Sequence, residues 1–324
     1  MIQCARLLTL AMAAVAVASM SIGASVAAAA TDTSRPATCK QAWDAIAAEQ
    51  AGLGSDDPAA WGRVSDAFIS MSDASFDGPL SNALGAVSTS ASDFATALNA
   101  DTEGDPSKAG FNASLAALGS VCAKLTITSH KESVPQFQKF TYQSGALNGL
   151  SPDGGTRAST VIAAVIDRQA KAAKRANGSP CMSGSNRCAY YVQTLEQRKC
   201  LSRFVCVRSE AGLLPSGANS GQDWVDTFAL DGLTGRQVAL SRVVPATQQP
   251  AFLTSVNAAV KAKLASEGLA NDPYWKPKVT MKDVRAWLPQ PDGIHIWFDK
   301  YAVAPGYFGI VHVIVRWTSF TPNT

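Results

Sequence analysis

The 324 residues carry a formal net charge of only +3, and 47% of them are hydrophobic. We expect no nucleic acid among the partners of the chain. The length allows two domains once any targeting segment is set aside.

The first thirty residues predict a secretory signal peptide. Arg6 precedes an apolar run, Leu7 to Ala30, that ends in small residues suited to cleavage. The same run could be retained as a membrane anchor, because about 20 apolar residues span a bilayer. Either outcome predicts a secreted or cell-envelope-associated protein. Cys4 and Cys39 do not follow the Leu-small-small sequence of a lipoprotein signal, so a lipid anchor is not expected.

Six cysteines follow the predicted signal peptide, and an even number in an exported chain predicts three disulfides. They are Cys39, Cys122, Cys181, Cys188, Cys200 and Cys206. A zinc site is a weaker explanation, because the chain has only three histidines, His130, His295 and His312. We therefore expect no bound metal and no cofactor.

Charge divides the rest of the chain into two parts. Residues 31–125 contain 12 acidic and 5 basic residues, a net charge of −7, and residues 126–324 contain 13 acidic and 22 basic residues, a net charge of +9. The sequence thus predicts a signal peptide over 1–30, a helical domain over 31–125 and a second domain over 126–324.

The 31–125 segment predicts a four-helix bundle. Its apolar residues recur at alternating spacings of three and four, and Gly- and Pro-containing breaks separate four such stripes. The longest stripe runs from Leu80 to Leu98, and the fourth runs from Phe111 to Leu125. In an up-down-up-down bundle the first helix starts where the fourth ends, so topology predicts a Cys39–Cys122 disulfide.

The second domain begins with a mixed pattern of strands and helices. An early strand is expected around residues 137–143, and a helix from Thr156 to about Asn177. Strands are expected over 189–197, 203–209 and 224–230, and a second helix over 250–267. The first helix ends in basic residues that interact with its dipole or form an anion-binding patch; these are Arg168, Lys171, Lys174 and Arg175.

The four remaining cysteines flank the first group of strands. Pairing between neighbours, Cys181 with Cys188 and Cys200 with Cys206, would close two short loops. A crossed arrangement stays open, because Cys206 lies within a predicted strand.

The chain ends in a predicted β-hairpin. Ile294, Ile296 and Phe298 alternate with His295 and Trp297, and a second alternating run extends from Gly309 to Trp317. The long loop between them contains Pro305 and Gly306, which cannot continue a strand ladder. The order of elements predicts an α+β fold, in which a mainly antiparallel sheet with two helices follows the disulfide-stapled four-helix bundle.

This hairpin resembles the C-terminal module of the RsiV-like extracellular family, the DUF3298 type. The family's hallmark is "dG-hydrophobic-F-x-x-Y-x-x-A-P-x-x-x-G", which is matched by Asp292, Gly293, Phe298, Tyr301, Ala304, Pro305 and Gly309. A second landmark is a strand followed by "tGr-x-hydrophobic-x-L", which is matched by Thr227–Leu230 and Thr234–Leu240. Together they cover roughly the last 190 residues.

The resemblance implies sensing by binding. In that family the extracellular module of lysozyme-sensing anti-sigma factors recognises lysozyme, and relatives occur in secreted mycobacterial antigens and beside separate deacetylase domains. Only six residues precede the apolar run, so we do not expect the sigma-factor role to carry over. The +9 charge of the second domain also disfavours lysozyme, which is typically cationic, as the ligand.

No motif in the sequence predicts a catalytic site. G-x-S-x-G, GxGxxG, GxxxxGK[ST] and HExxH are all absent. His295 and His312 could face one another, but two imidazoles without a third ligand make a poor metal site, so we expect packed or rim histidines. Asp292 and Asp299 are too far apart along one strand to share a bond as a glycosidase pair.

Aromatic residues in the hairpin loop are the best candidate ligand contacts. Tyr301, Pro305 and Tyr307 lie there, although the tyrosines could instead fold back over the hairpin core. The sequence thus favours an exported, non-enzymatic binding protein of an actinobacterial-type cell envelope, whose ligand is a protein or a glycan; the net charge of the second domain favours an anionic one. The alternative is a cell-wall-active hydrolase or transferase with a site assembled from distant residues.

Overall fold

The computed structural model describes residues 34–100, 105–176, 188–216, 218, 220–269 and 278–320. These residues form two compact units. The first contains the described residues up to Cys122 together with Gly149–Asp153, and the second contains Ala123–Asn148 and the described residues from Gly154 onward. The predicted signal peptide lies outside the described residues. None of the helices in the described ranges combines the length and the apolarity needed to cross a bilayer.

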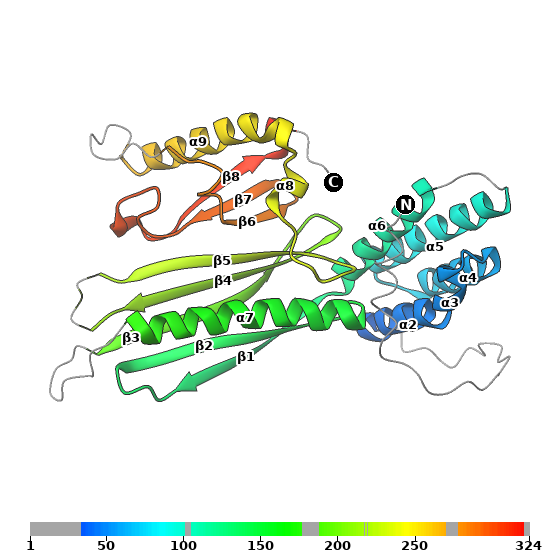
Figure 1. Ribbon diagram of the computed structural model, residues 1–324, viewed down its shortest axis with the longest axis horizontal. Coiled ribbons are helices and arrows are strands. Elements are labelled where there is room, and N and C mark those ends of the chain that lie inside the picture. Colours follow the sequence, from blue (N-terminus) through cyan, green and yellow to red (C-terminus); the bar gives the residue numbers. More distant parts are fainter. Residues whose placement is uncertain are drawn as a thin grey trace. The chain divides into compact units, whose positions relative to one another are not determined.

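The first unit is the predicted four-helix bundle (Figure 1). Its helices are α2 (Arg35–Ala48), α4 (Pro58–Ala74), α5 (Gly78–Asn99) and α6 (Asp105–Cys122), with a short α3 (Gln50–Gly54) between the first two. Asp57 and Asp77 each cap the helix that follows, accepting a hydrogen bond from the N–H of Ala59 and of Leu80.

Aromatic packing holds the centre of the bundle. The Trp61 ring, which is 2% exposed, lies 4.4 Å from that of Phe94 and 4.7 Å from that of Phe111, centroid to centroid. The Cys39–Cys122 disulfide joins the first helix to the last, as the topology predicted. Its two Cα atoms are 5.8 Å apart, a distance typical of disulfides.

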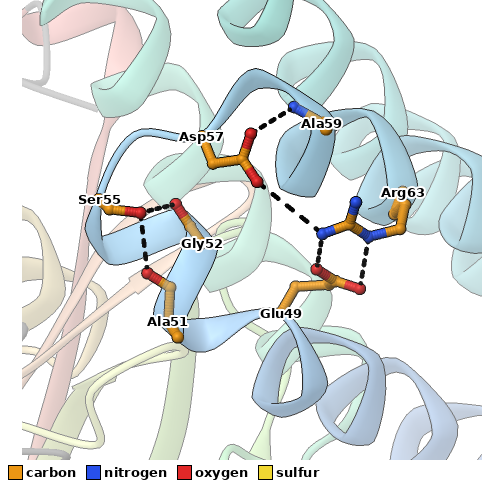
Figure 2. Close-up of polar contacts among 7 residues, drawn as sticks. All are labelled: Glu49, Ala51, Gly52, Ser55, Asp57, Ala59 and Arg63. Carbon is orange, nitrogen blue, oxygen red and sulfur yellow. Dashed lines mark hydrogen bonds and ion pairs between the residues drawn. The ribbon is translucent and has the colours of Figure 1, made fainter. Parts of the chain in front are cut away.

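A compact polar cluster fixes the turn between α3 and α4 (Figure 2). Both side-chain oxygens of Glu49 accept hydrogen bonds from Arg63, at 2.9 Å from Nε and 2.7 Å from Nη2. The Ser55 hydroxyl donates to carbonyl oxygens three and four residues earlier, and Asp57 accepts from the N–H of Ala59 at 3.0 Å. Every member of this cluster has a structural partner, so we assign it to the stability of the bundle.

The second unit contains a five-stranded sheet in the order β1-β2-β3-β4-β5. The strands are β1 (Lys124–Glu132), β2 (Phe137–Asn148), β3 (Ala189–Arg198), β4 (Phe204–Leu214) and β5 (Gln222–Asp231). All pairs are antiparallel except β2–β3, which is parallel. Helix α7 (Pro152–Ala176) connects these two parallel strands and packs on one face of the sheet, as Figure 1 shows.

A second, smaller sheet follows in the order β6-β7-β8 (Figure 1). Its antiparallel strands are β6 (Ala286–Gln290), β7 (Gly293–Phe298) and β8 (Val311–Arg316). Helix α9 (Gln249–Ser266) buries Phe252, Val256, Val260 and Leu264 in the same core as this sheet. Short helical turns complete the unit: α8 (Leu240–Val243), η1 (Ala246–Gln248), η2 (Gly306–Phe308) and η3 (Trp317–Ser319).

Hydrogen bonds join the smaller sheet to β5. The hydroxyl of Thr227 accepts from the N–H of Trp287 at 2.8 Å and donates to the carbonyl oxygen of the same residue at 3.0 Å. The N–H of Val225 donates to the Asp299 carboxylate at 2.9 Å. The two sheets of this unit are therefore held face to face by directed bonds as well as by apolar packing.

The predicted fold class is confirmed, with two corrections in detail. Leu125 does not end the fourth helix, which stops at Cys122; it lies in β1 and pairs with Leu147. The strands also form two sheets instead of one. Strand β6 carries no alternating signal and contains Pro289, which is tolerated because β6 lies at the edge of its sheet.

The predicted Cys200–Cys206 disulfide is present. Cys188 is also disulfide-bonded. Its predicted partner, Cys181, lies outside the described residues.

Candidate ligand-binding site

A cavity of about 600 Å³ lies within the second unit, lined by both of its sheets. The larger sheet contributes four charged side chains, and the smaller sheet and its loop contribute the rest. The lining residues are Arg198, Arg208, Glu210, Asp223, Gln290, His295, Trp297, Gly309, Ile310 and His312. The volume is in the range of small-molecule and peptide-side-chain sites.

Strand geometry explains why the four charges share one face. Arg208 and Glu210 are two residues apart on β4, so both side chains project to the same side. Arg198 lies opposite Cys206 across the β3–β4 pair, and Asp223 lies opposite Gly212 across the β4–β5 pair. All four residues therefore project toward the smaller sheet.

The smaller sheet contributes a chain of three hydrogen-bonded side chains. His295 Nε2 lies 2.8 Å from Asp292 Oδ1, and His295 Nδ1 lies 3.0 Å from His312 Nε2. Because a carboxylate only accepts, Nε2 of His295 carries a proton. In the neutral His295 ring Nδ1 then accepts a hydrogen bond from the Nε2–H of His312.

The surroundings of these three side chains favour a neutral His312. Burial is the main cause that lowers the pKa of His312 to about 4, and the neighbouring His295, Arg208 and Arg198 contribute to the same shift. The hydrogen bond from His295 holds the pKa of Asp292 below its usual value. Among the three hydrogen-bonded side chains, His312 lies next to the arginines, and its imidazole is uncharged above mildly acidic pH.

Stacking and ion pairs hold the cationic wall of the cavity in place. The His312 ring stacks on Trp297 with centroids 4.7 Å apart, and the Arg208 guanidinium lies 5.5 Å from the Trp297 centroid. Glu196 Oε1 lies 2.5 Å from Arg208 Nε and 2.7 Å from Arg198 Nη2. Arg208 Nη2 also lies 3.0 Å from Glu210 Oε2.

The loop between β7 and β8 borders the cavity through Gly309 and Ile310. It is anchored at its start, where the N–H of Lys300 donates to the carbonyl oxygen of Asp223 at 3.0 Å. Tyr301 follows with φ +70°, an unusual value for a residue with a side chain. Its ring lies against Gly306, where a Cβ would overlap it, so a larger residue at that position would displace the Tyr301 ring.

The tyrosines of the loop are accessible. Tyr301 is 52% exposed and Tyr307 is 77% exposed, whereas Pro305 is partly buried. The Tyr301 hydroxyl lies 3.2 Å from the Ser220 hydroxyl. These residues present surface for a ligand, and their role as contacts stays a prediction.

The structure pairs the histidines and separates the aspartates. His295 and His312 contact each other, and Asp292 supports them. Asp299 instead accepts a hydrogen bond from the N–H of Val225, and burial raises the pKa of its carboxyl group. Within the described residues, no group of three or more His, Cys, Asp or Glu side chains is arranged to hold a metal ion.

Sequence reasoning missed the four charged residues of the cavity wall. Arg208 and Glu210 are the two charged residues of the mostly buried strand β4, and both lie on the same side of it. Charged residues at alternating positions of a buried strand were the available signal. Arg198 and Asp223 had no comparable signal, since each lies at a strand end.

Two other polar groups lie away from the cavity. His130 Nε2 lies 2.7 Å from the Ser144 hydroxyl, and the His130 ring stacks on Tyr142. At the end of α7, Lys174 pairs with Glu132 at 2.5 Å and Lys171 pairs with Asp167 at 2.7 Å. We interpret these groups as cross-strand and surface pairing that supports the fold.

Two solved structures that resemble the chain are both DUF3298 family proteins, the family type that the motifs indicated. The protein from Pseudomonas aeruginosa PAO1 is 14% identical with a TM-score of 0.46; the match covers 61% of this chain and 91% of that one. The protein from Bacteroides fragilis is 10% identical with a TM-score of 0.36, over 61% of this chain and 92% of that one. No protein-family model and no curated protein matches the chain.

Proposed function

We propose that the protein is an exported, non-enzymatic binding protein of the bacterial cell envelope, whose second unit recognises a protein or glycan ligand. The ligand occupies the cavity between the two sheets and contacts the adjacent loop. The observation that carries this proposal is the position of two exposed tyrosines, Tyr301 and Tyr307, on the loop that also lines a cavity of about 600 Å³. Exposed aromatic anchors beside a polar cavity are typical of recognition surfaces.

The polar groups of the cavity support binding over chemistry. Both ring nitrogens of His295 have hydrogen-bond partners, and the pKa of His312, about 4, makes it a weak base near neutral pH. Arg208 is held by two carboxylates and by the Trp297 ring. Side chains fixed in this way present a preorganised surface to a ligand.

Charge bears on the choice of ligand. The +9 charge of residues 126–324 repels a cationic lysozyme at long range, and it attracts anionic wall polymers or acidic proteins. We therefore favour an envelope component over lysozyme as the ligand.

The test is capture from a cell-envelope fraction by the immobilised full-length chain. A double variant, Tyr301→Ser with Tyr307→Ser, should lose the captured material, whereas Phe76→Ser should retain it. Phe76 is the matched control, because it is 96% exposed and lies in the first unit. Equal capture by all three proteins would remove the support for this surface.

A cell-wall-active hydrolase or transferase is the second candidate function. One observation favours it: Glu210 and Asp223 line the same cavity as the hydrogen-bonded His295–His312 pair. Carboxyl and imidazole groups in one cavity are the usual general acids and bases of bond cleavage.

Incubation of the protein with purified cell walls tests this alternative. An enzyme would release soluble fragments at a rate that His312→Gln and Glu210→Gln both abolish and Phe76→Ser leaves unchanged. Absence of release from walls that bind the protein would reject the enzymatic function and retain the binding function.

A further inference from the structure

The charges that line the cavity are separated along the strands of the larger sheet. Four positions along β4 set the order of these charges. Arg198 lies opposite Cys206, the next two charged residues are Arg208 and Glu210 on β4 itself, and Asp223 lies opposite Gly212. Two residues of strand span roughly 7 Å, so the levels of Arg198 and Asp223 are roughly 20 Å apart. Positive groups therefore occupy one end of the cavity and negative groups the other.

Neighbouring charges reduce this separation, and the Arg208–Glu210 ion pair at 3.0 Å joins the two ends, but each end keeps its sign. At the positive end one carboxylate, Glu196, is shared through a single oxygen by Arg198 and Arg208, which leaves a surplus of one positive charge. At the negative end Glu210 and Asp223 face one ammonium group, that of Lys300, which lies 3.8 Å from Asp223. Summed over this end, the surplus is one negative charge, and Glu210 shares it with its partner Arg208.

His312 adds no charge of its own to the positive end, because burial and then the neighbouring charged groups, both arginines among them, lower its pKa to about 4. A ligand carboxylate placed there would meet guanidinium N–H groups that accept planar oxygen pairs well.

The edge of the smaller sheet adds a second recognition element. Strand β8 pairs with β7 alone among the described strands, so its other side presents backbone N–H and C=O groups. Gly309, Ile310 and His312, which line the cavity, lie in β8 or directly before it. An extended peptide can pair with such an edge while its side chains enter the cavity, and a glycan has no backbone for this pairing.

From these observations we infer that the cavity binds an extended peptide segment that carries a carboxylate and, a few residues away, an ammonium or guanidinium group. The carboxylate meets Arg198 and Arg208, and the cation meets Glu210 and Asp223. This inference rests on the proposed binding function and narrows its ligand to a dipolar peptide.

The chain contains its own reporters for the test, because it has only three histidines. The imidazole Hε1 signals of His295 and His312 report on the cavity, and that of His130, on β1, serves as the internal control. The probe is the blocked peptide acetyl-Glu-Ala-Ala-Lys-amide, titrated into the full-length protein. Its neutral analogue replaces both charged residues by Gln.

The charged peptide should shift the His312 and His295 signals and leave that of His130 unchanged. The neutral analogue should bind at least about fivefold more weakly than the charged peptide. Arg198→Gln should weaken binding of the charged peptide, and Asp223→Asn should do the same from the other end. Lys171→Gln on α7 is the matched control, since its side chain is 66% exposed and away from the cavity. Folding of each variant is checked by its His130 signal and thermal unfolding.

Two results would overturn the inference: equal affinity for the charged and the neutral peptide, or no shift at millimolar peptide. If envelope material is still captured through Tyr301 and Tyr307, only the dipolar ligand is rejected. If capture also fails, the binding function itself falls.

Discussion

His295 and His312 are joined by a hydrogen bond of 3.0 Å between Nδ1 of the first ring and Nε2 of the second. They are diagonal neighbours on the hairpin, because His312 lies opposite Trp297 and His295 lies opposite Ile314. Asp292 fixes the far side of His295, and Trp297 covers the His312 ring. A proton added to this pair therefore enters a confined site with positive neighbours.

The first prediction concerns pH. The pKa of His312 is about 4 in the folded chain and about 6.5 in the unfolded chain. Because the unfolded chain binds the proton first, the stability associated with His312 is complete above pH 6.5 and is lost as the pH falls toward 4. We expect a loss of roughly 2 kcal/mol across this window after solvent screening. Urea unfolding at a series of pH values measures it.

His312→Asn should flatten this pH dependence, whereas His130→Asn should leave it intact. A His312 Hε1 signal that titrates near pH 6.5 in the native protein would contradict the prediction.

The second prediction concerns the link between the two sheets. Thr227→Val removes the hydroxyl that satisfies both backbone groups of Trp287, and the site is buried. The free energy of unfolding should fall by about 2 to 4 kcal/mol, because two polar groups lose their partner. Thr227→Ser keeps the hydroxyl and should recover most of this loss, which a chemical denaturation curve can resolve.

The third prediction compares two glycines. Gly235 and Gly268 both have positive φ, +64° and +82°, but only at Gly235 would a Cβ overlap another backbone group, the carbonyl of Gly154. Gly268→Ala should therefore lower the free energy of unfolding by about 1 kcal/mol. Gly235→Ala should lower it by about 3 kcal/mol or more. Thermal unfolding of both variants gives the difference, and equal losses would refute the overlap.

The fourth prediction compares two disulfides. Cys39 and Cys122 are 83 residues apart, and Cys200 and Cys206 are six apart. On the chain-entropy model the first bond contributes about 4 kcal/mol and the second about 2 kcal/mol. Double alanine variants of each pair, compared by calorimetry, should lower the midpoint of unfolding in this order.

The bundle could be predicted because its signals are local. Apolar stripes, caps such as Asp57-Pro58 and glycine-containing breaks specify each helix, and the Cys39–Cys122 pairing follows from the order of the helices. The terminal hairpin was predictable for the same reason, since Ile294, Ile296 and Phe298 alternate cleanly.

The division into two sheets and the cavity between them could not be predicted. They depend on which strand faces are covered, and that is decided by contacts such as Thr227 with Trp287, 60 residues apart. The His295–His312 contact was foreseen as a possibility, but its support by Asp292 and its place in a charged cavity depend on the same long-range packing. Strand β1 gave little signal, because most of its residues are exposed.

The turn that carries Gly235 also bears on the rate of folding. The Arg157 side chain, near the start of α7, donates to the carbonyl oxygen of Thr234 at 2.8 Å, across 77 residues of sequence. Closing a loop of this length costs entropy before any contact is gained, so contacts of this kind form late. The second unit should therefore acquire its native turn only after α7 has docked, and refold more slowly than the helical bundle.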